Sequence, residues 1–286
     1  MTNPGEVHVA CDTNVFWCVL KNNAPWLGDF ETMAGGGVVI SFGDHALAEI
    51  SNQLEQGDFT EAEYAACIEK CSRFISARVP VLPGKRKLAA WCRKNPDATG
   101  LQEDEAYRSA CWKLMTGSKS LVDFERGITY CLAGGLKKKI PLKRGEAAKL
   151  LEKEREDWRQ EFGTKRPDWE RQKIDDRLKL LAGDLNQDID CDPKLMVRLD
   201  AALRHEDAVI RLVNQGMNVE SEKRRNDGID YNMAYVFMKR ILLCTAERKY
   251  LGCIRNLESF QSGWIFQPHE LVERWKAGTL ERPAWP

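Results

Sequence analysis

The sequence lacks a net charge, because its 43 lysines and arginines equal its 43 aspartates and glutamates among 286 residues. It also lacks any CxxC pair among its ten cysteines, and any apolar run near the roughly 20 residues that cross a bilayer. Its first residues have neither the basic nor the apolar part of an export signal. We therefore expect a cytoplasmic protein with reduced, mostly buried cysteines, rather than a membrane protein, a disulfide scaffold or a general nucleic-acid coat protein.

The charges are unevenly distributed along the chain. Residues 1–56 contain seven acidic residues and one basic residue, whereas residues 137–179 contain fifteen basic and ten acidic residues. A second basic cluster, at residues 223–225, directly precedes an acidic stretch. This segregation favours an acidic site beside a cationic surface. For the middle stretch, the alternative of solvated helix faces stays open.

Four short apolar segments are typical of buried parallel strands. They are residues 7–11, 37–42, 241–245 and 264–266, and each is followed by polar or turn residues and then by a helical pattern. Strands that alternate with helices in this way predict an α/β sheet built from strand-to-helix units.

The centre of the chain differs, because residues 60–215 have an almost entirely helical pattern with one convincing strand, at residues 79–82. The expected helices are residues 61–77, 104–115, 144–162 and 194–213. We predict one discontinuous α/β domain over residues 1–57 and 219–286, with a mainly helical insertion over residues 58–218.

Acidic residues stand near the carboxyl ends of the predicted strands. Asp12 follows the first strand, and Glu49 lies on the helix after the second. Asp230, with Asp227 before it, starts the helix that leads into the third strand, and Glu247 follows that strand. Parallel sheets form their sites at this edge, and carboxylates that meet there repel one another unless cations hold them. Oxygen ligands suit Mg²⁺ or Mn²⁺ better than zinc, and such ions can catalyse phosphodiester hydrolysis.

The acids belong to three short motifs. Residues 11–16 are CDTNVF, with Asp-x-Asn after an apolar strand, and residues 46–50 are ALAEI. Residues 227–247 contain an acid that opens a helix and then a strand that ends in Thr-x-Glu. This ordered combination resembles the PIN-domain nuclease family, over about residues 5–57 and 220–270.

The resemblance implies a three-layer α/β/α fold and a metal-dependent nuclease, most often a ribonuclease. The implied catalytic residues, which also bind the Mg²⁺ or Mn²⁺, are Asp12, Glu49, Asp230 and Glu247. Hydrogen bonds from Asn14 and Thr245 would support them, and Asp227 is a further candidate ligand. The chain departs from the family at Glu247, where aspartate is commoner. It also departs in the long interval between Glu49 and Asp230, so the helical insertion has no template.

We expect an endoribonuclease, with single-stranded DNA as the other open substrate. Basic side chains would grip phosphates without reading sequence. The candidates are Lys223, Arg224, Arg225, Lys137, Lys138 and Lys139. Aromatic side chains near the motifs could stack on unpaired bases, although packing in the core is the commoner use. They are Trp17, Trp26 and Tyr250.

Two other functions and one residue stay open. A PIN-like scaffold without activity, whose insertion binds a protein partner or a second copy, is favoured by Glu247 in place of aspartate. A haloacid-dehalogenase-like phosphatase also begins with a strand and Asp, but Asn14 stands where that family has its second Asp. His45 is either a helix-surface residue or a catalytic residue.

Overall fold

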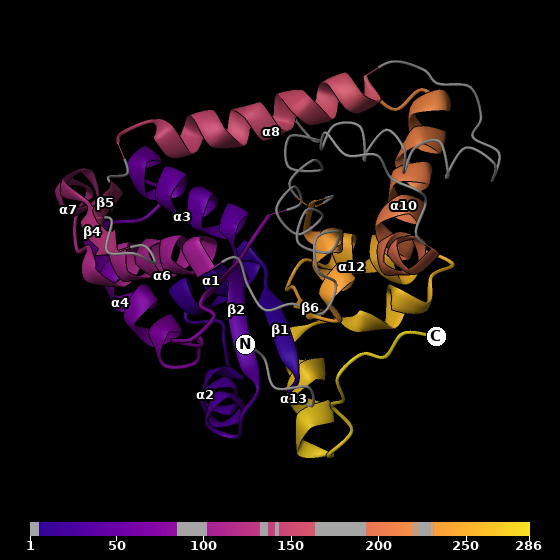
Figure 1. Cartoon of the computed structure of the whole chain (residues 1–286), viewed down its shortest axis with the longest axis horizontal. Coiled ribbons are helices and arrows are strands. Elements are labelled where there is room, and N and C mark those ends of the chain that lie inside the picture. Colours follow the sequence, from indigo (N-terminus) through magenta and orange to yellow (C-terminus); the bar gives the residue numbers. More distant parts are fainter. Residues whose placement is uncertain are drawn as a thin grey trace.

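The computed structural model describes residues 6–84, 102–131, 137–140, 143–163, 193–218, 221, 230 and 232–286. Its central sheet has five parallel strands in the order β3-β2-β1-β6-β7 (Figure 1). Their bounds are β1 His8–Cys11, β2 Val39–Gly43, β3 Val81–Leu82, β6 Leu242–Cys244 and β7 Ile265–Phe266. All five overlap the segments predicted as strands, so the predicted α/β class with a parallel sheet is confirmed.

The strands form here because their side chains are apolar on both faces of the sheet. Every residue of the five strands is buried. In the centre, Val9 of β1 is paired with Ile40 of β2 on one side and with Leu242 of β6 on the other. Continuous burial of this kind requires helices on both faces of a parallel sheet.

Helices lie on both sides of these strands, with α1, α3, α4 and α6 on one side and α10 and α12 on the other (Figure 1). The arrangement is compatible with a three-layer α/β/α fold. The helices next to the strands are α1 Thr13–Leu20, α2 Leu27–Gly35, α3 Asp44–Gln56, α4 Glu61–Ser72, α12 Arg248–Arg255 and α13 Pro268–Lys276. The first four connect β1, β2 and β3, whereas α12 lies between β6 and β7.

The remaining elements come mainly from the middle of the chain. They are α6 Gln102–Gly117, α7 Leu121–Arg126, β4 Ile128–Cys131, β5 Lys137–Ile140, α8 Glu146–Phe162, α10 Pro193–Asn214, η2 Ala234–Lys239 and η3 Phe260–Trp264. α6 packs against β3, α8 against α3, and α10 against η2. Because β3 pairs with β2, the sheet takes in a segment beyond residue 57. The division into a core and an insertion stays a prediction.

One expectation about the middle of the chain is wrong. Strands β4 and β5 form an antiparallel hairpin in the region predicted to have no strand beyond residues 79–82. The sequence pattern misses β5 because it contains three lysines, which are depleted in strands. The hairpin is held by the contacts of β4. Tyr130 of β4 lies opposite Lys138, and its ring packs edge-on against Tyr107 of α6 with 6.2 Å between centroids.

Candidate active site

Asp12 is the centre of the site, at the carboxyl end of β1. It is 4% exposed and caps α1, where its Oδ1 accepts a hydrogen bond of 2.6 Å from the Thr13 amide. Its Oδ2 accepts two more, from Asn14 Nδ2 at 3.0 Å and from Thr245 Oγ1 at 2.8 Å. Both carboxylate oxygens therefore have fixed directions, and the two residues predicted to support Asp12 are its partners.

Glu247 joins the same network from the end of β6. Its Oε2 accepts a 3.3 Å hydrogen bond from Asn14 Nδ2, so one amide lies between the carboxylates of Asp12 and Glu247. The Glu247 amide donates to Thr245 Oγ1 at 3.0 Å. Adjacent parallel strands end together here, because Cys11 of β1 is in register with Cys244 of β6. The Thr-x-Glu motif thus places its threonine and glutamate beside Asp12.

Glu49 reaches this edge from α3, where the Thr13 hydroxyl donates a hydrogen bond to Glu49 Oε2. Burial raises the pKa of the Glu49 carboxyl, the Thr13 bond lowers it, and the charge of Asp12 raises it again. The net shift is upward. Three acids that are far apart in the sequence are therefore linked. Thr13 joins Glu49 to Asp12 through its hydroxyl and its amide, and the side chains of Asn14 and Thr245 join Asp12 to Glu247.

Asp230 precedes η2 in the chain. It is partly buried. Burial raises the pKa of the Tyr250 hydroxyl well above its usual value, and the charges of Asp230, Asp12 and Glu247 raise it further. The charges of all three carboxylates thus act on the pKa of one phenol. The other predicted residues of this stretch lie outside the described residues: Asp227, Lys223, Arg224 and Arg225.

The side chains at this edge carry the type of ligand atom that a divalent cation prefers. Asp12, Glu49 and Glu247 offer carboxylate oxygens, which Mg²⁺ and Mn²⁺ prefer. Within the described ranges, however, no three histidine, cysteine, aspartate or glutamate side chains are grouped closely enough to hold a metal ion. The residues fit such an ion in chemistry, and the carboxylates would have to turn toward one another to bind it together.

His45 is buried, so a helix-surface role for it is wrong. It lies at the start of α3, and an added Cβ on Gly43 would clash with its ring, so the imidazole covers the end of β2. Burial alone would lower the pKa of His45. The Asp44 carboxylate, 3.7 Å from Nδ1, and the more distant Glu49 and Asp12 raise it from 6.5 to about 9. The Nε2 atom is buried and has no hydrogen-bond partner among the residues that the structure describes.

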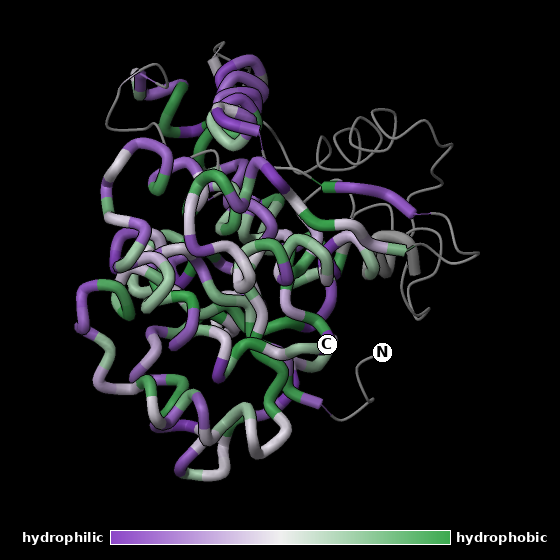
Figure 2. The backbone as a smooth tube through the Cα atoms, turned by 90° about the vertical axis from the view of Figure 1, so that its left-hand side faces the viewer, coloured by the Kyte–Doolittle hydropathy of each residue, from purple (hydrophilic) through white to green (hydrophobic). Residues whose placement is uncertain are grey.

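Helix α8 adds two residues that the sequence analysis does not single out. Arg155 is buried and lowers the pKa of Glu49 against the effect of burial. Glu154 carries a buried oxygen, Oε2, that has no hydrogen-bond partner within the described part of the chain. The spacing of Leu151, Arg155 and Trp158 is the sequence signal that could have indicated the buried side of α8. These three residues share that side of an otherwise hydrophilic helix (Figure 2).

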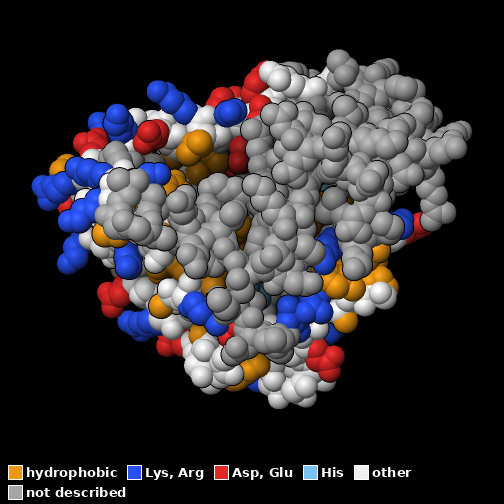
Figure 3. All heavy atoms as spheres, in the orientation of Figure 1, with side chains coloured by type: hydrophobic (Ala, Val, Ile, Leu, Met, Phe, Trp, Pro, Cys, Tyr) orange, Lys and Arg blue, Asp and Glu red, His pale blue; other side chains and the backbone are white. Residues whose placement is uncertain are grey.

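The lysines of β5 form a separate basic surface. Lys137, Lys138 and Lys139 are exposed, and in the part of the chain that the structure describes none of them has an ion-pair partner. Lys and Arg side chains gather at this end of the molecule, on the left of Figure 3, where Figure 1 places α7, β4 and β5. The surface is anchored through Tyr130 and Tyr107, as described above.

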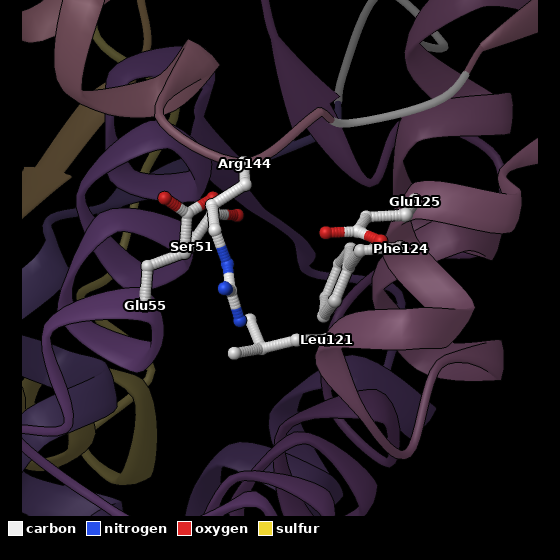
Figure 4. A pocket seen from close by; sticks show the side chains of 6 residues that line it. All are labelled: Ser51, Glu55, Leu121, Phe124, Glu125 and Arg144. Atoms are coloured by element: carbon white, nitrogen blue, oxygen red, sulfur yellow. The ribbon is translucent and has the colours of Figure 1, made fainter.

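A small, open hollow lies apart from the acidic edge, between α3 and α7 (Figure 4). The lining residues are Ser51, Glu55, Leu121, Phe124, Glu125 and Arg144. None of them belongs to the predicted site.

Of the three aromatic residues considered for stacking, Trp26 and Tyr250 are 6% and 3% exposed, so both serve the core.

Comparison of the chain with family models, with curated proteins and with solved structures found no match. The described helices include none that is both long and apolar enough to traverse a lipid bilayer.

Proposed function

We propose that this protein is a PIN-like, metal-dependent nuclease that hydrolyses phosphodiester bonds, with RNA as its first substrate. One observation carries the proposal. Asp12, Glu49 and Glu247 are far apart in the sequence but are linked by hydrogen bonds at one edge of the sheet. In open α/β sheets, this edge is where binding sites form.

The network prepares the carboxylates for this role. Asp12 accepts three hydrogen bonds, which orient its carboxylate, while Thr13 donates to Glu49 and Asn14 donates to Glu247. A bound Mg²⁺ or Mn²⁺ would lower the pKa of an attacking water and stabilise the leaving oxygen. Hydrolysis then adds water across the P–O bond, and the leaving hydroxyl takes up a proton.

The exposed lysines of β5 support a nucleic-acid partner. Lys137, Lys138 and Lys139 have the charge to bind phosphates, and a rigid aromatic contact holds their hairpin in place. Such contacts do not distinguish RNA from DNA. The preference for RNA comes from the family resemblance.

The test compares wild type with Asp12→Asn on total RNA, single-stranded DNA and duplex DNA, with Mn²⁺ or with EDTA. Asp58→Asn is the matched control, because Asp58 is exposed and away from the network. Wild type and the control should cleave with Mn²⁺, and Asp12→Asn should not cleave under either condition. Retained cleavage by Asp12→Asn, or no cleavage of any substrate by wild type, would reject the proposal.

An inactive PIN-like scaffold is the second candidate. It is favoured because the Asn14 amide lies between Asp12 and Glu247, and because no three acids are grouped for an ion in the described residues. A ligand that binds only the folded state raises its stability. Thermal unfolding with Mn²⁺ therefore separates the candidates: a nuclease should be stabilised, and Asp12→Asn should not, whereas a scaffold should respond in neither form.

A further inference from the structure

The hairpin of β4 and β5 belongs to a strongly basic segment of this neutral chain. Residues 126–145 contain six basic residues and no acidic residue. Besides the three lysines of β5, they are Arg126, Lys143 and Arg144, which are exposed and lie just before β4 and just after β5. Arg126 is paired with Asp123 at 3.7 Å on the exposed surface. The hairpin and its base therefore present a concentrated positive charge to solvent.

The two faces of the hairpin carry these charges differently. Successive residues of a strand point to opposite faces, so Lys137 and Lys139 share one face and Lys138 lies on the other. Lys138 is paired with Tyr130 of β4, and side chains that are paired in this way are neighbours on the same face. Tyr130 in turn packs edge-on against Tyr107 of α6. The face toward α6 thus combines a lysine with two aromatic rings.

Tyr107 is the aromatic side chain of this face that solvent reaches most. It is 40% exposed, although it lies on a helix that packs against both β3 and β4. The contact with Tyr130 fixes the position of the ring. A fixed, exposed ring beside a cation is the combination with which proteins bind unpaired bases, because the ring stacks on the base and the cation binds the phosphate. Bases inside a duplex are stacked on one another and cannot reach such a ring, and an acidic peptide would use the lysines alone.

We propose that the face of the hairpin toward α6 binds single-stranded nucleic acid, with Tyr107 stacked on an unpaired base and Lys138 on a neighbouring phosphate. Lys137 and Lys139, on the opposite face, add attraction to the backbone without reading sequence. This inference deepens the proposed function, on which it rests for the choice of a nucleic acid as the partner, and it names single strands as the substrate class. The binding itself requires no metal ion.

The test measures binding in EDTA, where the proposed metal-dependent cleavage does not occur. Fluorescence anisotropy follows a labelled oligouridine of about 12 nucleotides and an RNA duplex of the same length. Tyr107→Leu should weaken the binding of oligouridine about fivefold or more, which is the least expected for one lost stacking contact, and should change the binding of the duplex less than about twofold. Tyr107→Phe keeps the ring and should bind both probes like wild type.

Phe260→Leu is the matched control. Phe260 is 39% exposed and packs edge-on against Trp264, in the C-terminal part of the chain and on the other side of the molecule from the hairpin (Figure 1). This variant should bind both probes like wild type. A second measurement does not depend on the folding of any variant, because ultraviolet light crosslinks 5-iodouridine to an aromatic ring on which it stacks. An oligonucleotide that carries this base should attach to the wild-type protein at Tyr107, and attachment only at other residues would overturn the inference.

The outcomes separate this inference from the proposed function. If Tyr107→Leu binds oligouridine like wild type, or loses oligouridine and duplex equally, the inference is refuted, while cleavage by wild type with Mn²⁺ would leave the nuclease proposal standing. If oligouridine binding depends on Tyr107 but wild type cleaves no substrate, the inference stands and the nuclease proposal fails. If polyglutamate of equal charge displaces oligouridine equally well, the hairpin is a surface for acidic proteins, and the inference fails.

Discussion

Two buried histidines give the folded state a pH optimum that can be measured. His8 of β1 is 6% exposed, and its Nε2 is 2.8 Å from Ser41 Oγ. Burial, with the positive charges of Arg78 and Arg282, lowers the pKa of His8 from 6.5 to about 3. Because this pKa is depressed in the folded state, the stability from neutral His8 is complete above pH 6.5 and is lost as the pH falls toward 3.

His45 has the opposite effect. Its pKa rises from 6.5 to about 9 in the folded state, because Asp44, Glu49 and Asp12 outweigh the effect of burial. Glu154 of α8 also faces it with a negative charge. The stability from charged His45 is therefore complete below pH 6.5 and is lost as the pH rises through 9. Together the two histidines predict greatest stability near pH 6.5.

The magnitude follows from linkage, because one unit of pKa difference corresponds to about 1.4 kcal/mol. For His8, this predicts a loss of about 2 kcal/mol of unfolding free energy between pH 7 and pH 5. For His45, it predicts a loss of about 2 kcal/mol between pH 7 and pH 9. The assay is urea denaturation in EDTA at pH 5, 7 and 9, for wild type, His8→Gln and His45→Gln.

The difference between wild type and each variant isolates one histidine from all other titrating groups. The advantage of wild type over His8→Gln should shrink toward pH 5, and its advantage over His45→Gln should shrink toward pH 9. Differences that stay constant across the three pH values, to within about 0.5 kcal/mol, would refute the linkage of both sites to folding.

Three further predictions concern the network, α3 and the hairpin. Thr245→Val, which removes a buried hydroxyl that donates to a carboxylate, should lower the unfolding free energy by about 1–3 kcal/mol in urea denaturation. Gly43→Ala should lower the unfolding free energy by about 1–3 kcal/mol, because the added Cβ meets the His45 ring. In a double-mutant cycle, Gly43→Ala should cost much less in the His45→Ala background, where the ring is absent. Lys137→Ala/Lys139→Ala should weaken the binding of single-stranded RNA. The slope of log K against log salt concentration should fall in magnitude by about 1.4, because each of the two lost phosphate contacts contributes about 0.7.

Each of these predictions has a control on the same chain. Thr245→Ser keeps the hydroxyl and removes only the methyl group, so it should keep most of the stability. A loss in the Ser variant as large as in the Val variant would contradict a dominant role of the hydroxyl. For Gly43, independent and additive effects of the two changes would contradict the clash. For the hairpin, Lys113→Ala/Lys276→Ala removes the same charge from other exposed positions, and an equal change in salt slope would contradict a specific surface.

The strands and the acidic edge could be predicted because their physical causes act over a few residues. A strand buried on both faces must be apolar throughout, so residues 7–11 and 241–245 are visible as continuous runs. Parallel strands end at a common edge, so the residues that follow them meet there. This is why Asp12, Thr245 and Glu247 are found together.

The features that could not be predicted depend on contacts between distant segments. β5 has no pattern of its own, and it becomes a strand because β4 pairs with it and Tyr107 supports the pair. The burial of His45 and Arg155 depends on the packing of α8 against α3, which the sequence around His45 does not indicate and which only the spacing of Leu151, Arg155 and Trp158 suggests for α8. Charged side chains on a hydrophilic helix predict solvent exposure, and tertiary packing reverses this for one side of α8.

The motifs at the edge of the sheet combine structural and chemical roles, which decides how their variants should be interpreted. Asp12 caps α1 through Oδ1 and joins the acidic network through Oδ2. Asparagine is as good a helix cap as aspartate, whereas alanine loses about 0.5–2 kcal/mol at such a position. Asp12→Asn therefore preserves the cap while it removes the charge, and Asp12→Ala removes both. We expect both variants to lose Mn²⁺ binding equally, and mainly Asp12→Ala to unfold more easily in EDTA. This result would show that the charge of Asp12 serves the metal site and that its helix cap serves the stability of the fold.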